Sequence, residues 1–209
     1  MKSLIYLLVI AGLATATSAF IPAKPQPTKT TAAQSTRKWK VDKLHSNVRF
    51  TVAHMVVSET EGSFKVFDGS LEYSKADMSD AKISFTVDVK SINTDNETRD
   101  GHLKSDDFFN AEKFPVMTFV GTSFKPVGKN KYELTGNLTI RDVTKQVKFD
   151  VTYGGELTTK GGTKAGFKAK TTIDRFDYNL KWNRAVEAGG LVVGKEVEIS
   201  VLLEMDEIK

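Results

Sequence analysis

The chain has 209 residues and contains no cysteine. Its fold therefore cannot depend on disulfide bonds, and it offers no thiolate as a soft metal ligand. A fold without covalent cross-links has to be stabilised by its hydrophobic core. The roughly 170 residues from Trp39 onward are enough for one domain with a well-developed core.

The sequence also lacks the short motifs that mark common enzymes. It has no GxSxG elbow, phosphate-binding loop or dinucleotide fingerprint. Ser46 follows His45 directly, and neighbouring residues of a strand point to opposite faces, so the two cannot pair as nucleophile and base. We therefore predict no enzyme and no catalytic residues.

Histidine is scarce, and its spacing does not indicate a metal site. The three histidines are His45, His54 and His102, with no HxH or HxxxH pair among them. We predict no metal and no cofactor, and we expect the histidines to be hydrogen-bonded at strand ends. A site assembled in space from all three, with a metal or redox role, stays open as an alternative.

An excess of charge of one sign is missing too. There are 30 lysine and arginine residues against 26 acidic residues, a formal charge of +4. The two signs are interspersed along the chain and form no basic stripe. This pattern excludes nucleic acid as an expected partner and indicates a solvated surface of mixed charge.

Only one long hydrophobic run is present, LIYLLVIAGLA at 4–14. It follows Lys2 and precedes the small residues Thr17-Ser18-Ala19, the pattern of a secretory signal peptide at 1–19 cleaved near Ala19. No cysteine follows it, which excludes a lipid-modified N-terminus. Residues 20–37 are rich in Pro, Thr and Lys and indicate a disordered linker. We expect an exported protein, periplasmic or secreted, whose folded domain spans 38–209.

Alternation of apolar and polar residues runs through the rest of the chain. In NVRFTVAH (47–54), Val48, Phe50 and Val52 share one face. The same period of two recurs in five further runs, which are KISFTVDVKSI (82–92), YELTGNLTIRD (132–142), KQVKFDVTYGG (145–155), GFKAKTTID (166–174) and KEVEISVLLEM (195–205). This period predicts antiparallel strands that each have one buried and one solvated face.

Two less regular runs complete the count of about eight strands. GSFKVFDGSLEY (62–73) changes parity between Phe64 and Phe67, which predicts a bulge or bend. FPVMTFVGTSFK (114–125) is apolar on both parities near its start. Turn signals separate the runs at Lys75–Asp80, Val127–Asn130, Arg141–Lys145 and Gly154–Gly166. We predict an all-β fold, an eight-stranded antiparallel up-and-down barrel, with a two-sheet sandwich as the alternative.

One or two short helices are expected, and DNETRDGHLKSDDFF (95–109) is the clearest candidate. Thr94 or Asp95 would be the N-cap, and Glu97 would lie near the positive end of the helix. Gly101 weakens the helix by about 1 kcal/mol relative to alanine. We expect this segment to cross one end or one side of the sheet.

Phenylalanine is abundant, with 13 in the chain against five tyrosines and two tryptophans. Phenyl and aliphatic groups on the inner face of a barrel would enclose an apolar tube suited to a long hydrocarbon. A solid core made of the same residues is the alternative. We predict an apolar pocket lined by Phe50, Val52, Phe64, Phe85, Val87, Phe108, Phe109, Phe114, Phe119, Leu138 and Phe149.

Several segments in colinear order resemble the YceI-like family of lipid- or polyisoprenoid-binding proteins. The most specific are VDKLHSNVRFTVAHM (41–55), RDGHLKSDDFFNAEKFP (99–115), LTIRDVTK (138–145) and GFKAKTTIDRFDY (166–178). The resemblance implies a lipocalin-like barrel that holds an isoprenoid chain in an elongated apolar pocket. It also implies export. Where the family usually continues Asp-Phe-Gly, this chain has Asp177-Tyr178-Asn179. Because of this difference, the resemblance does not determine the shape of the pocket mouth at this segment.

The resemblance also implies polar residues at the pocket mouth or around the helix. These are His45 and His54 of the first motif, Arg99, Asp100 and His102 of the second, and Arg175 and Asp177 of the last. We interpret Arg99 as a clamp whose partners are Asp100 and His102, which would fix the helix against the barrel.

The expected partner is a long-chain isoprenoid or other lipid, including a quinone, held for transport, storage or sequestration. Open barrel mouths and edge strands would also suit a homodimer or a transient membrane contact, and the sequence leaves both open. A barrel of the envelope with a structural or stress-response role and no ligand is a further alternative.

Overall fold

The computed structural model describes residues 35–185 and 191–208. The signal peptide predicted at 1–19 and all but the last three residues of the predicted linker lie outside these ranges. Arg37 already belongs to the first strand. None of the helices in the described ranges is long and apolar enough to span a membrane.

Strands dominate the described residues. Eleven strand segments accompany one α-helix and two 3₁₀ turns. Their bounds are β1 Arg37–Val41, β2 Asn47–His54, β3 Ser58–Phe64, β4 Phe67–Tyr73, β5 Lys82–Asp88, η1 Val89–Ser91, β6 Ile92–Asn93, α1 Glu97–Lys104, β7 Val116–Gly128, β8 Lys131–Ile140, β9 Val143–Thr159, β10 Gly162–Asp174, η2 Arg175–Tyr178 and β11 Val193–Ile208.

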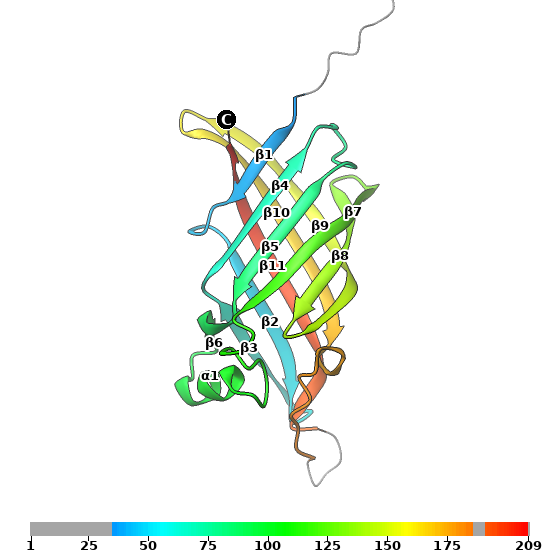
Figure 1. The fold of residues 1–209 in the computed structure, drawn as a ribbon. Helices are drawn as coiled ribbons and strands as arrows, with labels where there is room; N and C mark the ends of the chain where they lie inside the picture. The colour runs from blue at the N-terminus through cyan, green and yellow to red at the C-terminus, as the bar shows by residue number, and fades with distance from the viewer. Residues whose placement is uncertain (1–34, 186–190, 209) are drawn as a thin grey trace, which may run out of the picture. The chain divides into compact units, whose positions relative to one another are not determined.

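These eleven segments form one closed antiparallel barrel of eight strands (Figure 1). Three of the eight strands are interrupted, so that β1 continues into β2, β3 into β4, and β5 into β6. Each strand pairs antiparallel with the next along the chain, and β11 closes the ring by pairing with both β1 and β2. The predicted eight-stranded antiparallel barrel is therefore confirmed. Its closure pairs most strands on both sides, which removes the open edges of a flat sheet.

The three interruptions lie next to each other across the sheet. They fall at 42–46, at 65–66 and at η1. The backbone N–H of Lys65 donates to the carbonyl of Ser91 at 3.1 Å, which ties the second interruption to the third. The parity change predicted between Phe64 and Phe67 is confirmed, since both rings are buried while Val66 between them is exposed.

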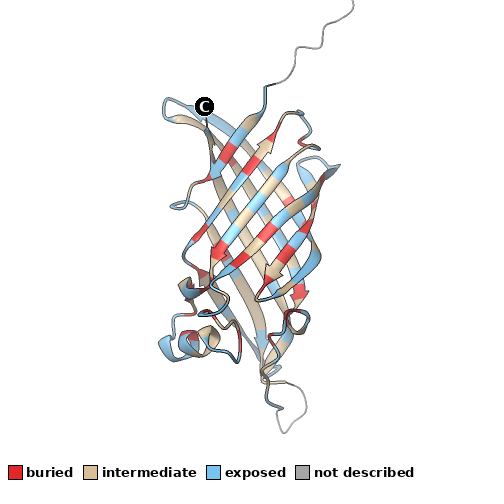
Figure 2. Ribbon diagram, viewed as in Figure 1, coloured by how far each residue is buried: buried red, intermediate tan, exposed pale blue. Residues whose placement is uncertain are grey.

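Alternation along the strands follows the predicted pattern (Figure 2). In β8, for example, Leu134, Leu138 and Ile140 are buried, and in β9 Phe149 and Val151 are buried. The turn predicted within Gly154–Gly166 is present but shorter than that range, because β9 runs on to Thr159 and β10 begins at Gly162. Gly155 has φ +97° and allows a bulge there, so the two strands continue past it instead of turning.

The helix expected within 95–109 is present as α1, but its N-cap is Asn96 and not Thr94 or Asp95. The Asn96 side chain accepts a hydrogen bond from the N–H of Arg99 at 2.9 Å. This bond satisfies one of the free donors of the first helical turn. Thr94 is used elsewhere, as described below.

One half of the barrel interior is filled by aromatic rings. Phe124 and Tyr132 stack with their centroids 4.5 Å apart, and Tyr153 and Phe167 lie 5.1 Å apart. Trp39 is almost fully buried beside them in the same core. Phe124 and Tyr132 lie within a few residues of the turn between β7 and β8, and Tyr153 and Phe167 belong to the strands that the β9–β10 turn joins. These two turns lie at the end of the barrel opposite α1 (Figure 1). This half is a solid core.

In the other half, strand does not complete the wall. β6 pairs with β3 and β5 pairs with β7, but none of the described pairings joins β6 to β7. The connection between β6 and β7, residues 94–115, contains α1 and lies beside this opening (Figure 1). Its residues Leu103, Phe108 and Phe109 thereby take the place of strand residues in the wall.

Candidate functional site

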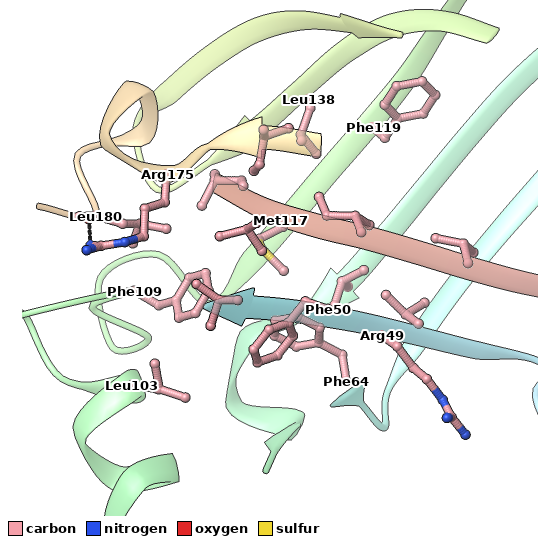
Figure 3. Close-up of a pocket in the computed structure, with 18 of the residues that line it drawn as sticks. Arg49, Phe50, Phe64, Leu103, Phe109, Met117, Phe119, Leu138, Arg175 and Leu180 are labelled. Atoms are coloured by element: carbon pink, nitrogen blue, oxygen red, sulfur yellow. Dashed lines mark hydrogen bonds between the residues drawn. The ribbon is translucent and has the colours of Figure 1, made fainter. Parts of the chain in front are cut away.

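The half of the barrel beside α1 encloses an apolar cavity of ≈ 150 Å³. Side chains from β2, β3, β5, β7, β8, β9, β10 and β11 and from the loops around α1 and η2 surround it (Figure 3). The lining residues are Val48, Arg49, Phe50, Val52, Phe64, Phe85, Val87, Leu103, Phe108, Phe109, Met117, Thr118, Phe119, Leu138, Ile140, Phe149, Ile173, Arg175, Leu180, Val193, Val197, Ile199 and Val201.

Strand geometry points the aliphatic and phenyl groups inward. On β2, Val48, Phe50 and Val52 follow the period of two, and the register places Phe50 opposite Ile199 on β11 and opposite Gly62 on β3. A Cβ atom at Gly62 would lie 2.3 Å from Cζ of Phe50. Glycine at this position therefore gives the Phe50 ring its place against the wall.

The same pairing of ring and glycine occurs on the facing wall. Phe119 lies over Gly136, where a Cβ atom would approach Cζ of the ring to 2.3 Å. Its ring also meets Phe149 edge-on at 5.3 Å between centroids. Glycine thus lets two rings lie flat on the sheet, which leaves space at the centre of the cavity.

The loop side of the cavity is closed by the Phe108-Phe109 pair. Phe109 meets Phe64 edge-on with centroids 6.0 Å apart. Phe108 lies 5.3 Å from Trp182 and 5.1 Å from His102. These contacts join the segment after α1 to the segment after η2, so that both loops form one end of the cavity.

Arg175 is the charged side chain that enters this end, and it is 3% exposed. Its guanidinium donates to the carbonyls of Leu180, Trp182 (2.9 Å), Gly194 (2.8 Å) and Val193 (3.0 Å). Burial lowers the pKa of Arg175, yet the group stays cationic because an arginine pKa lies so far above neutrality. Arg175 therefore fixes the chain after η2 against β11, and four of its five N–H donors bind protein carbonyls.

The remaining polar lining is slight. Arg49 borders the cavity, but its side chain points away from it (Figure 3). Thr118 is the one hydroxyl in the described lining, which contains no acid and no histidine. Such an enclosure favours a hydrocarbon and disfavours any charged group, because a buried charge without a partner is costly.

Ten of the eleven residues predicted for an apolar pocket lie on this lining. The exception is Phe114, whose prediction as a pocket residue is wrong. Its ring is half-buried outside the cavity, with the guanidinium of Arg141 5.5 Å from its centroid and the ammonium of Lys113 5.2 Å away. The turn after Asn110 directs Phe114 away from the interior.

The polar network predicted around α1 has different partners from those expected. Arg99 donates from Nε to Oγ1 of Thr94 at 2.8 Å and from a terminal nitrogen to its carbonyl at 2.7 Å. Asp100 accepts from the N–H and the hydroxyl of the same Thr94 at 2.8 and 2.6 Å. The predicted clamp of Arg99 on Asp100 and His102 is therefore wrong, and Thr94 is the residue that both helix side chains hold.

His102 and Asp177 also lie outside the cavity. His102 Nε2 is 2.8 Å from a carboxylate oxygen of Asp107, and the imidazole ring packs edge-on against Trp182 at 5.0 Å. Asp177 is exposed, with its carboxylate 3.8 Å from Nζ of Lys145. Of the seven predicted polar residues, only Arg175 borders the cavity.

The three histidines have separate neighbours. His54 ends β2 opposite Ser58 and Val193, and His102 belongs to α1. His45 lies in the interruption between β1 and β2, where Nδ1 is 2.9 Å from Asp42 and 3.7 Å from Glu204. Among the described residues, the one group with metal-ligand spacing is Asp42, His45 and Glu204, so the histidines do not form a joint site.

A lysine ammonium occupies the centre of that acidic group. Nζ of Lys164 lies 2.8 Å from carboxylate oxygens of Asp42, Glu204 and Asp206. Lys164, and to a lesser degree His45, hold the pKa of Asp42 well below its usual range, and Asp42 in turn raises the pKa of His45. The cluster is an ion-pair network that joins β10, β11 and the 42–46 interruption.

Sequence reasoning missed part of the lining. Val197, Ile199 and Val201 of β11 had the correct parity in the sequence and could have been included on that signal. Leu180 supplies one of the carbonyls that bind Arg175 and lies outside the strands, so no periodicity marks it. Arg37 was predicted to be the last residue of the linker. It belongs instead to β1, and its guanidinium lies 2.6 Å from carboxylate oxygens of both Glu156 and Glu207.

Comparison with known proteins identifies relatives over most of the chain. The model of the YceI-like domain matches residues 39–205. A UPF0312 protein of Staphylococcus epidermidis is 36% identical over 169 residues, which is 80% of this chain and 96% of that protein. A UPF0312 protein of Staphylococcus aureus is 38% identical over 165 residues, 78% of this chain and 94% of that one.

Solved structures share the barrel. Burkholderia cenocepacia BcnA is similar with a TM-score of 0.70 and 27% identity, covering 78% of this chain and 98% of that chain. The Campylobacter jejuni YCEI protein has a TM-score of 0.62 at 29% identity, covering 75% and 90%. A polyisoprenoid binding domain from Saccharophagus degradans, at 17% identity and a TM-score of 0.58 over 81% and 98%, is similar in fold. The match over residues 39–205, the relatives and the shared barrel agree, and the chain belongs to the YceI-like family.

Proposed function

We propose that the protein is a non-enzymatic carrier that holds an isoprenoid or another long-chain lipid by its tail in the apolar cavity. The observation that carries the proposal is the lining itself, in which phenyl and aliphatic groups surround a space of ≈ 150 Å³. The structural neighbour from Saccharophagus degradans is a polyisoprenoid binding domain, which agrees with such a ligand. Export, and a role in transport, storage or sequestration, belong to the same proposal.

The cavity volume limits how much of a ligand the closed barrel encloses. An engineered apolar cavity of about 150 Å³ holds one benzene molecule, so the present space of ≈ 150 Å³ suits about one isoprene unit. A longer tail would extend through the end formed by the loops after α1 and η2. The solid aromatic core in the other half prevents passage through the whole barrel.

Burial of the tail supplies the affinity. At about 0.8 kcal/mol per methylene-sized group, one five-carbon unit contributes roughly 3–4 kcal/mol before the costs of association. The head group gains little inside, because the cation of Arg175 already donates to protein carbonyls. We therefore expect selection for tail shape and hydrophobicity, with quinone and polyprenyl head groups both accepted outside.

Native mass spectrometry of freshly purified protein tests the proposal. We expect a bound mass that disappears after organic extraction and is identified as a lipid in the extract. The extracted protein should then take up farnesol, a three-unit isoprenoid, with one molecule bound per chain. Protein that is purified empty and takes up neither farnesol nor a fatty acid would refute the carrier assignment.

A further inference from the structure

The turn between β2 and β3 places three apolar side chains in solvent. Val57 is 87% exposed, Val56 71% and Met55 46%. They follow one another at the tip of a hairpin, so they form a small protruding apolar surface, which we call the 55–57 tip. A run of three exposed apolar residues is unusual for the surface of a soluble domain.

The backbone of this turn makes the residue types harder to explain by folding. Met55 has φ 51° and Val56 has φ 67°. Positive φ at both positions is the geometry that Asn-Gly adopts at low cost, whereas it strains a β-branched residue such as valine. Asparagine and glycine would fit the turn better, so the apolar side chains serve something other than the fold.

The tip adjoins the cavity. Val52, three residues before Met55, lines the cavity, and so does Val193, which pairs with His54 across the β2–β11 ladder. The N–H of Met55 donates to the carbonyl of Val192 at 2.9 Å, which ties the tip to the start of β11. The β2–β3 turn and the start of β11 lie at the same end of the barrel (Figure 1).

Basic side chains accompany the tip. The N–H of Val192, whose carbonyl binds Met55, donates to the carbonyl of Arg184 at 2.9 Å. Backbone hydrogen bonds thus connect the tip through Val192 to the segment after η2. Within the described residues 180–185 and 191–194, Lys181 and Arg184 are exposed and no acid is present, so these two cations outnumber the one exposed acid, Glu59, that lies two residues beyond the tip on β3. Exposed cations beside protruding apolar groups match the charge of an anionic lipid surface.

We propose that the 55–57 tip inserts into the interfacial layer of an anionic phospholipid bilayer and brings the loop end of the cavity against the membrane. This inference rests on the proposed lipid-carrier function, since a tail leaving a bilayer would then enter the cavity without crossing water. The protein thus docks on the membrane itself, and Met55, Val56 and Val57 form the docking surface.

Flotation with lipid vesicles tests the proposal. We expect the wild-type protein to float with mixed phosphatidylcholine–phosphatidylglycerol vesicles and less with phosphatidylcholine alone. The variant M55N/V56G/V57S should bind the mixed vesicles roughly tenfold more weakly. Its melting temperature should equal or exceed that of the wild type, because Asn-Gly relieves the strained turn. A destabilised variant is thereby distinguished from one that has lost only the docking surface.

A matched control removes apolar surface at the opposite end. Val127 and Leu157 are 65% and 67% exposed near the β7–β8 and β9–β10 hairpins. V127S/L157S should float as the wild type does. Equal flotation of the wild type and the tip variant would overturn the proposal. So would a change in molar mass of the tip variant by light scattering, which would show that the tip binds a second copy of the chain.

Farnesol uptake without vesicles separates this proposal from the carrier function on which it rests. The tip variant should take up farnesol from dilute solution as the wild type does but should acquire it from loaded mixed vesicles more slowly. If neither protein takes up farnesol, the carrier function fails. If both take it up and both acquire it from vesicles at the same rate, the carrier function stands and the docking proposal fails.

Discussion

Replacing Val201 by phenylalanine should stabilise the empty protein and exclude its ligand. Val201 lines the cavity on β11, and its cross-strand neighbour Ala169 is small enough to leave room for a larger ring. At about 24 cal/mol per Å³ of empty space, a cavity of ≈ 150 Å³ corresponds to about 3.6 kcal/mol of unfolding free energy. A ring that fills about a third of this space would recover about 1 kcal/mol.

Thermal unfolding of extracted protein provides the measurement. For a domain of this size, about 1 kcal/mol raises the melting temperature by about 2–4 °C. Farnesol should raise the melting temperature of the wild type by a similar or larger amount and have little effect on Val201→Phe. Leu202→Phe is the matched control, because Leu202 is 37% exposed on the outer face of the same strand and does not line the apolar cavity.

Either of two results would refute this reasoning. A Val201→Phe protein that melts below the wild type would show that the space is not available to a ring and that the substitution overpacks the core. A Val201→Phe protein that binds farnesol as tightly as the wild type would show that the tail lies elsewhere.

Three further predictions concern the wall, the loop end and a turn. Phe119→Asp should lower the unfolding free energy, measured in urea, by more than about 4 kcal/mol because it buries an unpaired charge. Val120→Asp, on the outer face, should unfold near the wild-type midpoint, and an equal loss of stability in both variants would disprove the assignment of the faces. Arg175→Lys should cost about 2–3 kcal/mol in the same assay, since a lysine cannot reach all four carbonyls, and an unchanged midpoint would show that these bonds contribute nothing. Bonds from the hydroxyl and N–H of Ser74 and from the N–H of the next residue lower the pKa of Asp80 to about 2. The unfolded chain then takes up the proton first as the pH falls, so the melting temperature of Asp80→Asn should lie below the wild type at pH 7 and converge with it between about pH 4 and pH 2; a constant difference across this range would contradict the assignment.

The fold was predictable because its signals are local. A period of two along each strand determines which side chains face inward, and it placed Phe50, Phe85 and Phe149 correctly. The bend between Phe64 and Phe67 was visible as a change of parity for the same reason. Eight such strands can bury their apolar faces together by closing into a barrel.

The parts that failed depend on contacts between distant segments. Arg175 binds four backbone carbonyls, and carbonyls leave no trace in the residue types of the segments that supply them. The choice of Asn96 over Thr94 as the helix cap depends on Asp100 and Arg99, which bind Thr94 themselves. Residue patterns therefore indicated the right helix with the wrong cap and partners.

Cavity size was beyond the sequence for a related reason. The same kinds of side chain fill one half of the barrel and leave space in the other. The stacked pair Phe124 and Tyr132 fills its half, whereas Phe119 lies flat over Gly136 and leaves room. Alternation predicts which face a ring occupies, but the space that remains depends on how rings from different strands interlock.

The interruptions at 42–46, 65–66 and η1 lie side by side, so that three neighbouring strands are broken at the same level of the barrel. On the side of these interruptions that is nearer to α1, β2, β3 and β6 form one part of the sheet. This part pairs with β11 along one edge and is bordered by loop residues instead of a strand along the other. Because β6 pairs with β3 and with no described strand on its other side, we expect the amide hydrogens of this part of the sheet to exchange faster than those of strands that are paired on both sides. A ligand with more carbons than the resting cavity accommodates would gain space here at the smallest cost in broken backbone hydrogen bonds.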